Sequence, residues 1–537
     1  MRDLKELTGY DIITEEKIPE VNGTGYILSH KKTKARVLVI ANDDENKVFN
    51  IGFRTPPYDD SGIPHILEHS VLCGSRKYPV KDPFVELAKG SLNTFLNAMT
   101  YSDKTVYPIA SCNEKDFENL MDVYLDAVFY PNIYEHTEIM RQEGWHYELE
   151  TVEGELIYNG VVFNEMKGAF SSPEQQMYSK IEKLLLADTP YKNESGGDPA
   201  AIPTLSQERF LDFHRKYYHP SNSYIYLYGD LDMYKELDYI DKEYLSSFDY
   251  REIDSAIAVQ TAYEQMKDES CFYSIAENES EENQTFLTYN MVVGSSLDKK
   301  QSVAMNILEY AIMDAPGAPL KKALVDAGIG EDVFASFDDG IRQTIFSIVA
   351  RNANMSDKER FVSVIRDTLT DLSGHGEEGK AIDRTSIEAA INNFEFKHKE
   401  ANFGRFPKGL MMGLDAFNTW LYDDASALEM FKLNEVYDEL KESLKTGYFE
   451  ELIWEKLVQN TFGMIFVMKP KKGLDKENDA AEKQKLADYK ASLTENELEQ
   501  VVSDTKELKL YQETPSPAED MEKVPLLNIS DIRKEIH

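Results

Sequence analysis

The sequence predicts an α+β fold. We expect two homologous α/β sandwich domains, each an antiparallel-rich sheet packed with helices, followed by a C-terminal helical hairpin. Three observations lead to this prediction. The chain has 537 residues, which is too many for one apolar core. Helix-like and strand-like segments are mixed throughout. A stretch of the first half also recurs weakly in the second half.

The first domain is predicted at residues 1–255 and begins with strands. Its helix at 64–73 has Pro64 near its first position and Gly74 just past its end, the usual places for these residues. Alternating and β-branched residues indicate the strands, and longer periodic runs indicate the other helices. The expected strands are 26–30, 35–41, 47–54, 97–108 and 223–229, and the other helices are 82–89, 114–129 and 210–218.

The second domain, predicted at residues 265–470, reads as a weak copy of the first. The segment 65–72 reads HILEHSVL and the segment 306–313 reads NILEYAIM. Both follow a strand and a polar turn. Asn306 and Tyr310 stand where the first copy has histidines, so we expect the second domain to be non-catalytic. The alternative is that two amphipathic helices share Ile-Leu-Glu by chance.

The last part of the chain changes in composition. A charged segment at 471–513 has helical spacing and is predicted to form a helical hairpin. Residues 514–537 are first rich in proline and acids, as in a linker, and then turn apolar and stop. We expect this segment to be the start of a second half of a longer chain.

The charge of the chain restricts its partners. Acidic residues outnumber basic ones 96 to 58, for a formal charge of −38. Such a field repels nucleic acid and anionic membranes and favours cationic ligands. We therefore expect neither nucleic acid nor membrane as a partner. Solubility alone is the alternative explanation of the charge.

The cysteines and the N-terminus point to a compartment. Cys73, Cys112 and Cys271 match no metal or redox spacing, and an odd, low count argues against a disulfide framework. The first 20 residues lack the apolar core of a secretory signal and are too acidic for a transit peptide. No apolar run is long enough to span a bilayer. These features predict a cytoplasmic protein.

One motif carries metal chemistry. His65 and His69 lie four positions apart, so on a helix they are about 40° apart in azimuth and roughly 6 Å apart along the axis. Both imidazoles can then reach one ion. Glu68, beside His69, can lie next to that ion without binding it and act as general base. This HxxEH order is the reverse of HExxH, the pattern of inverzincins. The alternative is a helix with two surface histidines.

A catalytic zinc needs a third protein ligand. We expect it to be Glu165, which follows the apolar residues of Gly160–Phe163 at the start of a helix. Most acids in so acidic a chain are merely solvated, so this pattern is weak on its own. The remaining histidines compete poorly. His214 and His219 are five positions apart, and the others considered are isolated.

At these residues the sequence resembles the pitrilysin and insulin-degrading family of metallopeptidases, and within it the presequence protease branch. The resemblance is carried by SGIPHILEHSVLCGS around His65, by GSLNTFLNAMTYSDKTVYP at 90–108 and by GVVFNEMKGAFSSP at 160–173. SGGDPAAIPTL at 195–205 and FHRKYYHPSNSYIYLYGDLD at 213–232 extend it. It covers nearly the whole chain.

The resemblance implies a zinc metalloendopeptidase with one Zn²⁺ per chain. By this likeness His65, His69 and Glu165 are the zinc ligands and Glu68 is the base. The stretch Leu96–Met99, centred on Asn97 and Ala98, looks like the family's edge strand, which binds extended peptides by β-augmentation. An ordinary interior strand is the alternative there. Unstructured, basic, presequence-like peptides are the expected substrates.

Relatives of this branch enclose a chamber between two halves, and this chain looks like the N-terminal half. The far half of the relatives supplies an Arg and a Tyr near the reacting carbonyl. We therefore keep two alternatives, a non-catalytic structural or partner subunit and a peptide-binding half without activity of its own. A C-terminal half, from the same full-length chain or a second copy, is a possible partner.

Overall fold

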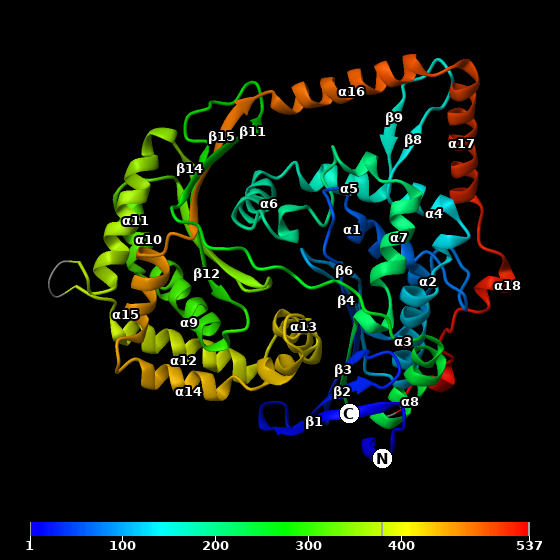
Figure 1. The fold of residues 1–537 in the computed structure, drawn as a ribbon, viewed down its shortest axis with the longest axis horizontal. Coiled ribbons are helices and arrows are strands. Elements are labelled where there is room, and N and C mark those ends of the chain that lie inside the picture. The colour runs from blue at the N-terminus through cyan, green and yellow to red at the C-terminus, as the bar shows by residue number, and fades with distance from the viewer. Residues whose placement is uncertain (1, 377–379, 535–537) are drawn as a thin grey trace.

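The computed structural model describes residues 2–376 and 380–534, and within them two large mixed sheets packed with helices confirm the predicted α+β class (Figure 1). The larger sheet has the order β1-β2-β3-β10-β4-β7-β5, with β6 beside β7. Its strands are β1 (Tyr10–Ile18), β2 (Gly23–His30), β3 (Arg36–Ala41), β4 (Lys47–Arg54), β5 (Asn93–Leu96), β6 (Met99–Thr100), β7 (Lys104–Ser111) and β10 (Ser223–Gly229).

The second sheet has the order β11-β15-β12-β14-β13. A small separate pair, β8 (His146–Glu148) and β9 (Ile157–Asn159), lies beside the first unit. The strands of the second sheet are β11 (Lys267–Ile275), β12 (Thr285–Ser295), β13 (Asp332–Asp338), β14 (Gln343–Ala353) and β15 (Gly463–Lys472).

Strand order supports the interpretation of an internal repeat. In the larger sheet β3 pairs parallel with β10, and β10–β4, β4–β7 and β7–β5 are antiparallel. In the second sheet β11 pairs parallel with β15, and β15–β12, β12–β14 and β14–β13 are antiparallel. A helix follows the middle strand in each copy, and the next helix begins at Pro83 or Pro319. The domain limits at 255 and 265 stay a prediction.

The helices cover the sheets and join them. Those of the first unit are α1 (Ile63–Val71), α2 (Pro83–Gly90), α3 (Glu114–Phe129), α4 (Thr137–Glu143), α5 (Val161–Ala169), α6 (Pro173–Leu185), α7 (Gln207–Tyr217) and α8 (Met233–Glu243). Those after the second sheet begins are α9 (Lys299–Glu309), α10 (Pro319–Asp326), α11 (Lys358–Leu372), α12 (Arg384–Glu400), α13 (Lys408–Trp420), α14 (Asn434–Ser443) and α15 (Tyr448–Ile453).

The end of the chain wraps back onto the first unit. The predicted hairpin is present as α16 (Leu474–Ser492) and α17 (Glu495–Glu513). The segment after it includes the short helix α18 (Ala518–Met521) and does not run free. Val524 is buried in the first core, and the Asn119 side chain donates a hydrogen bond to the carbonyl of Pro525 at 3.0 Å.

Two strand predictions differ from the structure. The single strand expected at 97–108 is wrong, because β6 covers only two residues and the chain reverses before β7 begins. Strand β1 was not predicted. It pairs only with β2 at the edge of the sheet, and its central residues alternate between exposed and half-buried, so the sequence there lacks a clear apolar stripe.

Each sheet has a second apolar face that is covered by a helix from the other half of the sequence. In β10, alternate tyrosines point away from the first core, and α13 packs on them (Figure 1). The helix comes very close. The Tyr226 hydroxyl donates to the carbonyl of Gly409 at 2.9 Å, and a Cβ at Gly413 would lie 2.3 Å from a ring carbon of Tyr226. Helix α6 covers the second sheet in the same way.

We predict that Gly413→Ala lowers the thermal midpoint, because the added methyl group overpacks against Tyr226 at a cost of about 1–3 kcal/mol. Gly168→Ala is the matched control. Gly168 is also inside a helix, but nothing lies near its would-be Cβ, so alanine there should stabilise by about 0.4–1 kcal/mol. Thermal unfolding followed by circular dichroism measures both, and equal midpoints would contradict the close packing.

Candidate metal centre and cleft

Two helices bring the predicted ligands together. His65 and His69 lie one turn apart on α1, and Glu165 lies on α5. The Nε2 atoms of His65 and His69 are 3.7 and 3.6 Å from the same carboxylate oxygen of Glu165, and the two ring centroids are 5.0 Å apart. Among the described residues, these three form the group of side chains whose ligand atoms all lie within 4.8 Å of one another. Their role as ligands stays a prediction.

The orientation of His65 depends on a tight loop. Nδ1 of His65 lies 3.0 Å from the carbonyl oxygen of Gly196, which can only accept, so Nδ1 carries the proton and Nε2 is left with its lone pair. The loop reaches this position because α1 begins at a glycine. A Cβ at Gly62 would lie 2.7 Å from the Cα of Gly197.

The orientation of His69 depends on a buried acid. Nδ1 of His69 lies 3.3 Å from Glu143 at the end of α4, so this nitrogen also donates and Nε2 again faces Glu165. Helices α4 and α5 are joined at this point. The N–H of Phe163, in the first turn of α5, donates to the carbonyl of Gly144. Outer hydrogen bonds of this kind fix ring orientation in metal sites.

The carboxylates around His69 favour positive charge at the centre. Burial lowers the pKa of His69, but the hydrogen bond to Glu143 and the charges of Glu68, Glu143 and Glu165 outweigh it, so the pKa is raised. Burial raises the pKa of Glu143, but its hydrogen bonds, first that from His69, outweigh it and the pKa is lowered. The site therefore stabilises a cation close to the two Nε2 atoms.

A cleft of about 410 Å³ opens beside this centre. Glu68 and His69 line it, and so do Asn97 and Ala98, at the point between β5 and β6. Glu68 is only 9% exposed, yet no group in residues 2–376 or 380–534 hydrogen-bonds its carboxylate. Its carboxylate is therefore free to accept a proton from a molecule in the cleft.

The predicted substrate strand lies at an edge. Strand β5 is the last in the order of the larger sheet, so one side of it is unpaired within that sheet. Leu96 ends β5 and Met99 begins β6, and neither lines the cleft. The backbone of Asn97 is partly engaged, since its carbonyl accepts from the Tyr124 hydroxyl at 3.3 Å. Peptide binding along this edge stays a prediction.

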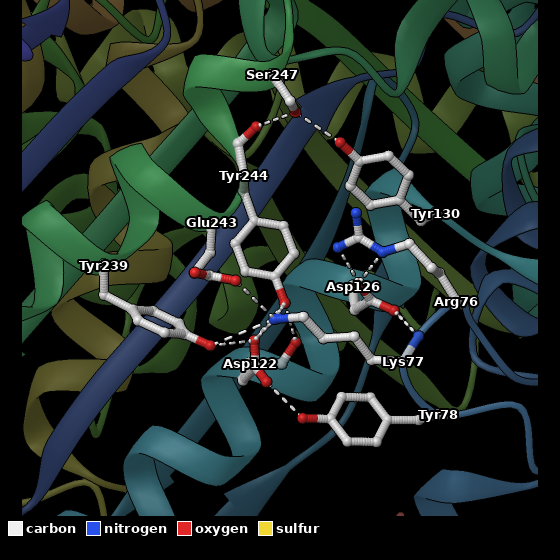
Figure 2. A network of polar contacts seen from close by, with 10 residues as sticks. All are labelled: Arg76, Lys77, Tyr78, Asp122, Asp126, Tyr130, Tyr239, Glu243, Tyr244 and Ser247. Atoms are coloured by element: carbon white, nitrogen blue, oxygen red, sulfur yellow. Dashed lines mark hydrogen bonds and ion pairs between the residues drawn. The ribbon is translucent and has the colours of Figure 1, made fainter. Parts of the chain in front are cut away.

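A polar network anchors the chain that leaves α1 (Figure 2). Asp122 of α3 accepts hydrogen bonds from Lys77 at 2.9 Å and from Tyr239 at 2.6 Å, and also from two further tyrosines. Asp126 accepts from Arg76 at 2.6 Å. The complete set in the figure is Arg76, Lys77, Tyr78, Asp122, Asp126, Tyr130, Tyr239, Glu243, Tyr244 and Ser247. The loop from α1 to the cleft is thus tied to α3 and α8.

Sequence reasoning missed the residues that orient the histidines. Glu143 is one of 96 acidic residues, and its spacing from His69 has no periodicity that would single it out. Gly196 acts through its carbonyl oxygen, which every residue has. Only the pair of adjacent glycines, Gly196-Gly197, was a local signal of close backbone approach.

Three family descriptions match the sequence. "Insulinase (Peptidase family M16)" matches residues 48–179, and "Peptidase M16 inactive domain" matches 204–394. A third description, of the region associated with subfamily C of the M16 peptidases, matches 468–537. The first match contains the metal centre, and the second contains part of the second sheet with its helices.

Curated relatives and solved structures agree with these matches. The chain is 48% identical to protein HypA of Clostridium perfringens over 98% of this chain and 54% of the relative. It is 41% identical to presequence protease 1, chloroplastic/mitochondrial, of Arabidopsis thaliana over 99% of this chain and 50% of the relative. The chain thus spans about half the length of these relatives. The crystal structure of pitrilysin matches with a TM-score of 0.58 and 18% identity, over 87% of this chain and 47% of that one.

Within the described residues no helix combines the length and apolarity needed to cross a membrane.

We predict that the isolated chain binds one zinc ion, and that His65→Ala or Glu165→Gln abolishes this binding because each removes one of the three converging ligand atoms. Glu143→Gln should weaken zinc affinity by about 10- to 100-fold, since it removes the charge that orients and polarises His69. Isothermal titration with zinc measures the affinities. Full affinity in Glu143→Gln would contradict the orienting role.

We predict that Asp122→Asn destabilises the protein by about 1–3 kcal/mol at pH 7, because buried donors lose a charged acceptor. Burial raises the pKa of Asp122, but its hydrogen bonds from tyrosines and Lys77 outweigh it, so the folded pKa is below the ordinary value. The stabilisation is present above the unfolded pKa and is lost as pH falls through the folded pKa. Thermal midpoints of wild type and variant should therefore converge below about pH 4. Asp249→Asn, at an exposed position, is the control.

Proposed function

We propose that this chain, which belongs to the insulinase family of peptidases (family M16), is the metal-binding half of a zinc metalloendopeptidase that cleaves unstructured peptides. One observation carries the proposal. Nε2 lone pairs of His65 and His69 face the Glu165 carboxylate, while the unbonded carboxylate of Glu68 lies in the adjacent cleft. This is the arrangement that metal-assisted peptide hydrolysis requires.

The donor set fits zinc. Tetrahedral ligands with bonds of about 2.0–2.1 Å are about 3.3 Å apart, close to the 3.6 and 3.7 Å between Glu165 and the two Nε2 atoms. Three electron-rich atoms face one another here, so a cation between them relieves their repulsion. His65, His69 and Glu165 would hold the ion and leave a further position open. Bound zinc would supply an activated water and polarise the peptide carbonyl.

The protein's own residues do the remaining work. Glu68 accepts a proton from the attacking water and passes it to the leaving amine, for which it must be unpaired and close to His69. Gly196 and Glu143 hold the two imidazoles with Nε2 directed at the centre. Burial of Glu68 keeps bulk water from competing for its proton.

The substrate class follows from the sheet edge and the charge. An extended peptide can add to the free edge at β5 through main-chain hydrogen bonds, which would place it past Asn97 and Ala98 towards Glu68. Such binding is tolerant of sequence and requires an unfolded segment. The charge of −38 favours basic peptides, of which presequences are one kind.

Half the length of the relatives lies outside this chain. We propose that the remaining half, in the same chain or from a partner, encloses the peptide and completes the reaction site. A second candidate function is a peptide-binding half without turnover, which the exposed side of the centre favours. Glu165 is 53% exposed, so on that side this chain alone does not exclude water.

Glu68→Gln should reduce cleavage of an unstructured basic peptide by about 10²–10⁴-fold while zinc affinity is retained, because only the proton acceptor is lost. The assay compares this variant with wild type, with and without chelator. Glu208→Gln, at an exposed position on α7, is the control. Cleavage by Glu68→Gln at the wild-type rate would refute the assignment of the base. Zinc binding without cleavage by wild type would support the peptide-binding half.

A further inference from the structure

Helix α6 belongs to the first half in sequence but packs on the second sheet. Its buried residues Met177, Ile181 and Leu185 are spaced by four and are at most 2% exposed, so they form one apolar stripe. The stripe shares an apolar cluster with alternate residues of β15. The β15 members of this cluster are Met464, Phe466 and Met468. Figure 1 shows α6 lying between the second sheet and the helices α1 and α5.

Polar contacts reinforce this packing at both ends of α6. At its N-terminus, Glu174 forms an ion pair with Arg351 of β14 at 2.7 Å. Beyond its C-terminus, the hydroxyl of Tyr191 accepts a hydrogen bond from the backbone N–H of Arg342 at 2.9 Å. The helix is therefore held by the second sheet along its whole length.

The same helix is joined to the metal centre on both sides. Before it, α5 with Glu165 ends only a few residues away, and the Gln176 side chain donates to the carbonyl of Phe170 at 2.6 Å. After it, the chain returns to α1. Lys183 and the N–H of Glu194 each bond Asp60, at 2.7 Å, in the turn before α1. Two residues after Glu194 comes the carbonyl that orients His65.

We propose that the second sheet is a positioning scaffold for the metal centre, and that Phe466 is a positioning residue in it. By clamping α6, the sheet fixes both the helix that carries Glu165 and the loop, residues 193–198, that orients His65. This inference rests on the proposed function and deepens it, because it assigns a role in metal binding to the domain whose own copy of the motif has Asn306 and Tyr310.

The sheet offers a matched control on its opposite face. Phe466 is 1% exposed and points towards α6, whereas Phe346 of β14 is fully buried on the face that packs on the sheet's own helices. Phe→Ala at either position creates a cavity in the same sheet, so the general loss of stability is similar. Only the first cavity loosens the clamp on α6.

The experiment compares Phe466→Ala with Phe346→Ala at a temperature where both are folded. Zinc affinity should fall by about tenfold or more in Phe466→Ala and stay within about threefold of wild type in Phe346→Ala. Hydrogen exchange of the metal-free chains should be faster at residues 161–169 and 193–198 in Phe466→Ala only. If either alanine variant does not fold, Phe466→Leu and Phe346→Leu replace the pair, with the same order and smaller changes.

Equal zinc affinities and equal exchange in the two variants would overturn the positioning role. Failure of the wild-type chain to bind zinc would instead refute the proposed function. In that case the exchange comparison, which needs no metal, still decides whether the second sheet holds the 161–169 and 193–198 segments. Faster exchange there in Phe466→Ala alone would support the clamp, and no difference would overturn it.

Discussion

A sheet with two apolar faces must be covered on both, and this constraint shapes the whole chain. Helices of its own unit cover one face of each sheet. Helix α13 covers the other face of the larger sheet, and α6 covers the other face of the second. Because each of these helices comes from the opposite half of the sequence, neither half completes its core alone. The interlock also sets where α5 ends and where the loop after α6 returns, and the metal centre lies between these points.

The centre illustrates how weak local signals become a defined geometry. Two imidazoles on one helix can rotate freely unless their outer nitrogens are occupied. Here a carbonyl oxygen and a buried carboxylate occupy them, and both acceptors lie on segments that pack against α1. The consequence is electrostatic as well as geometric. Both Nε2 lone pairs are directed at Glu165, and the surrounding acids favour a cation there.

Much of the fold could be read from the sequence because it rests on short-range periodicity. The strand SYIYLYG at 223–229 and the helix at 114–129 were predicted with the bounds that the structure shows, since each has an unbroken pattern over its length. The strand at 97–108 was not, because a sharp reversal interrupts it and a strand of two residues has no period to detect. Strand β1 escaped for a related reason, as its charged, half-solvated edge lacks an apolar stripe.

The sequence by itself determined that His65 and His69 share one helical face with Glu68 beside them, because a spacing of four residues is a local property of the helix. It also indicated the repeat and the hairpin. Tertiary structure alone decided that Glu143 and the Gly196 carbonyl hold the histidines, and that α6 and α13 exchange sheets. The reason is physical. Hydrogen bonds and packing between segments far apart in the chain depend on which surfaces meet, and an apolar stripe on a helix does not specify which sheet will cover it.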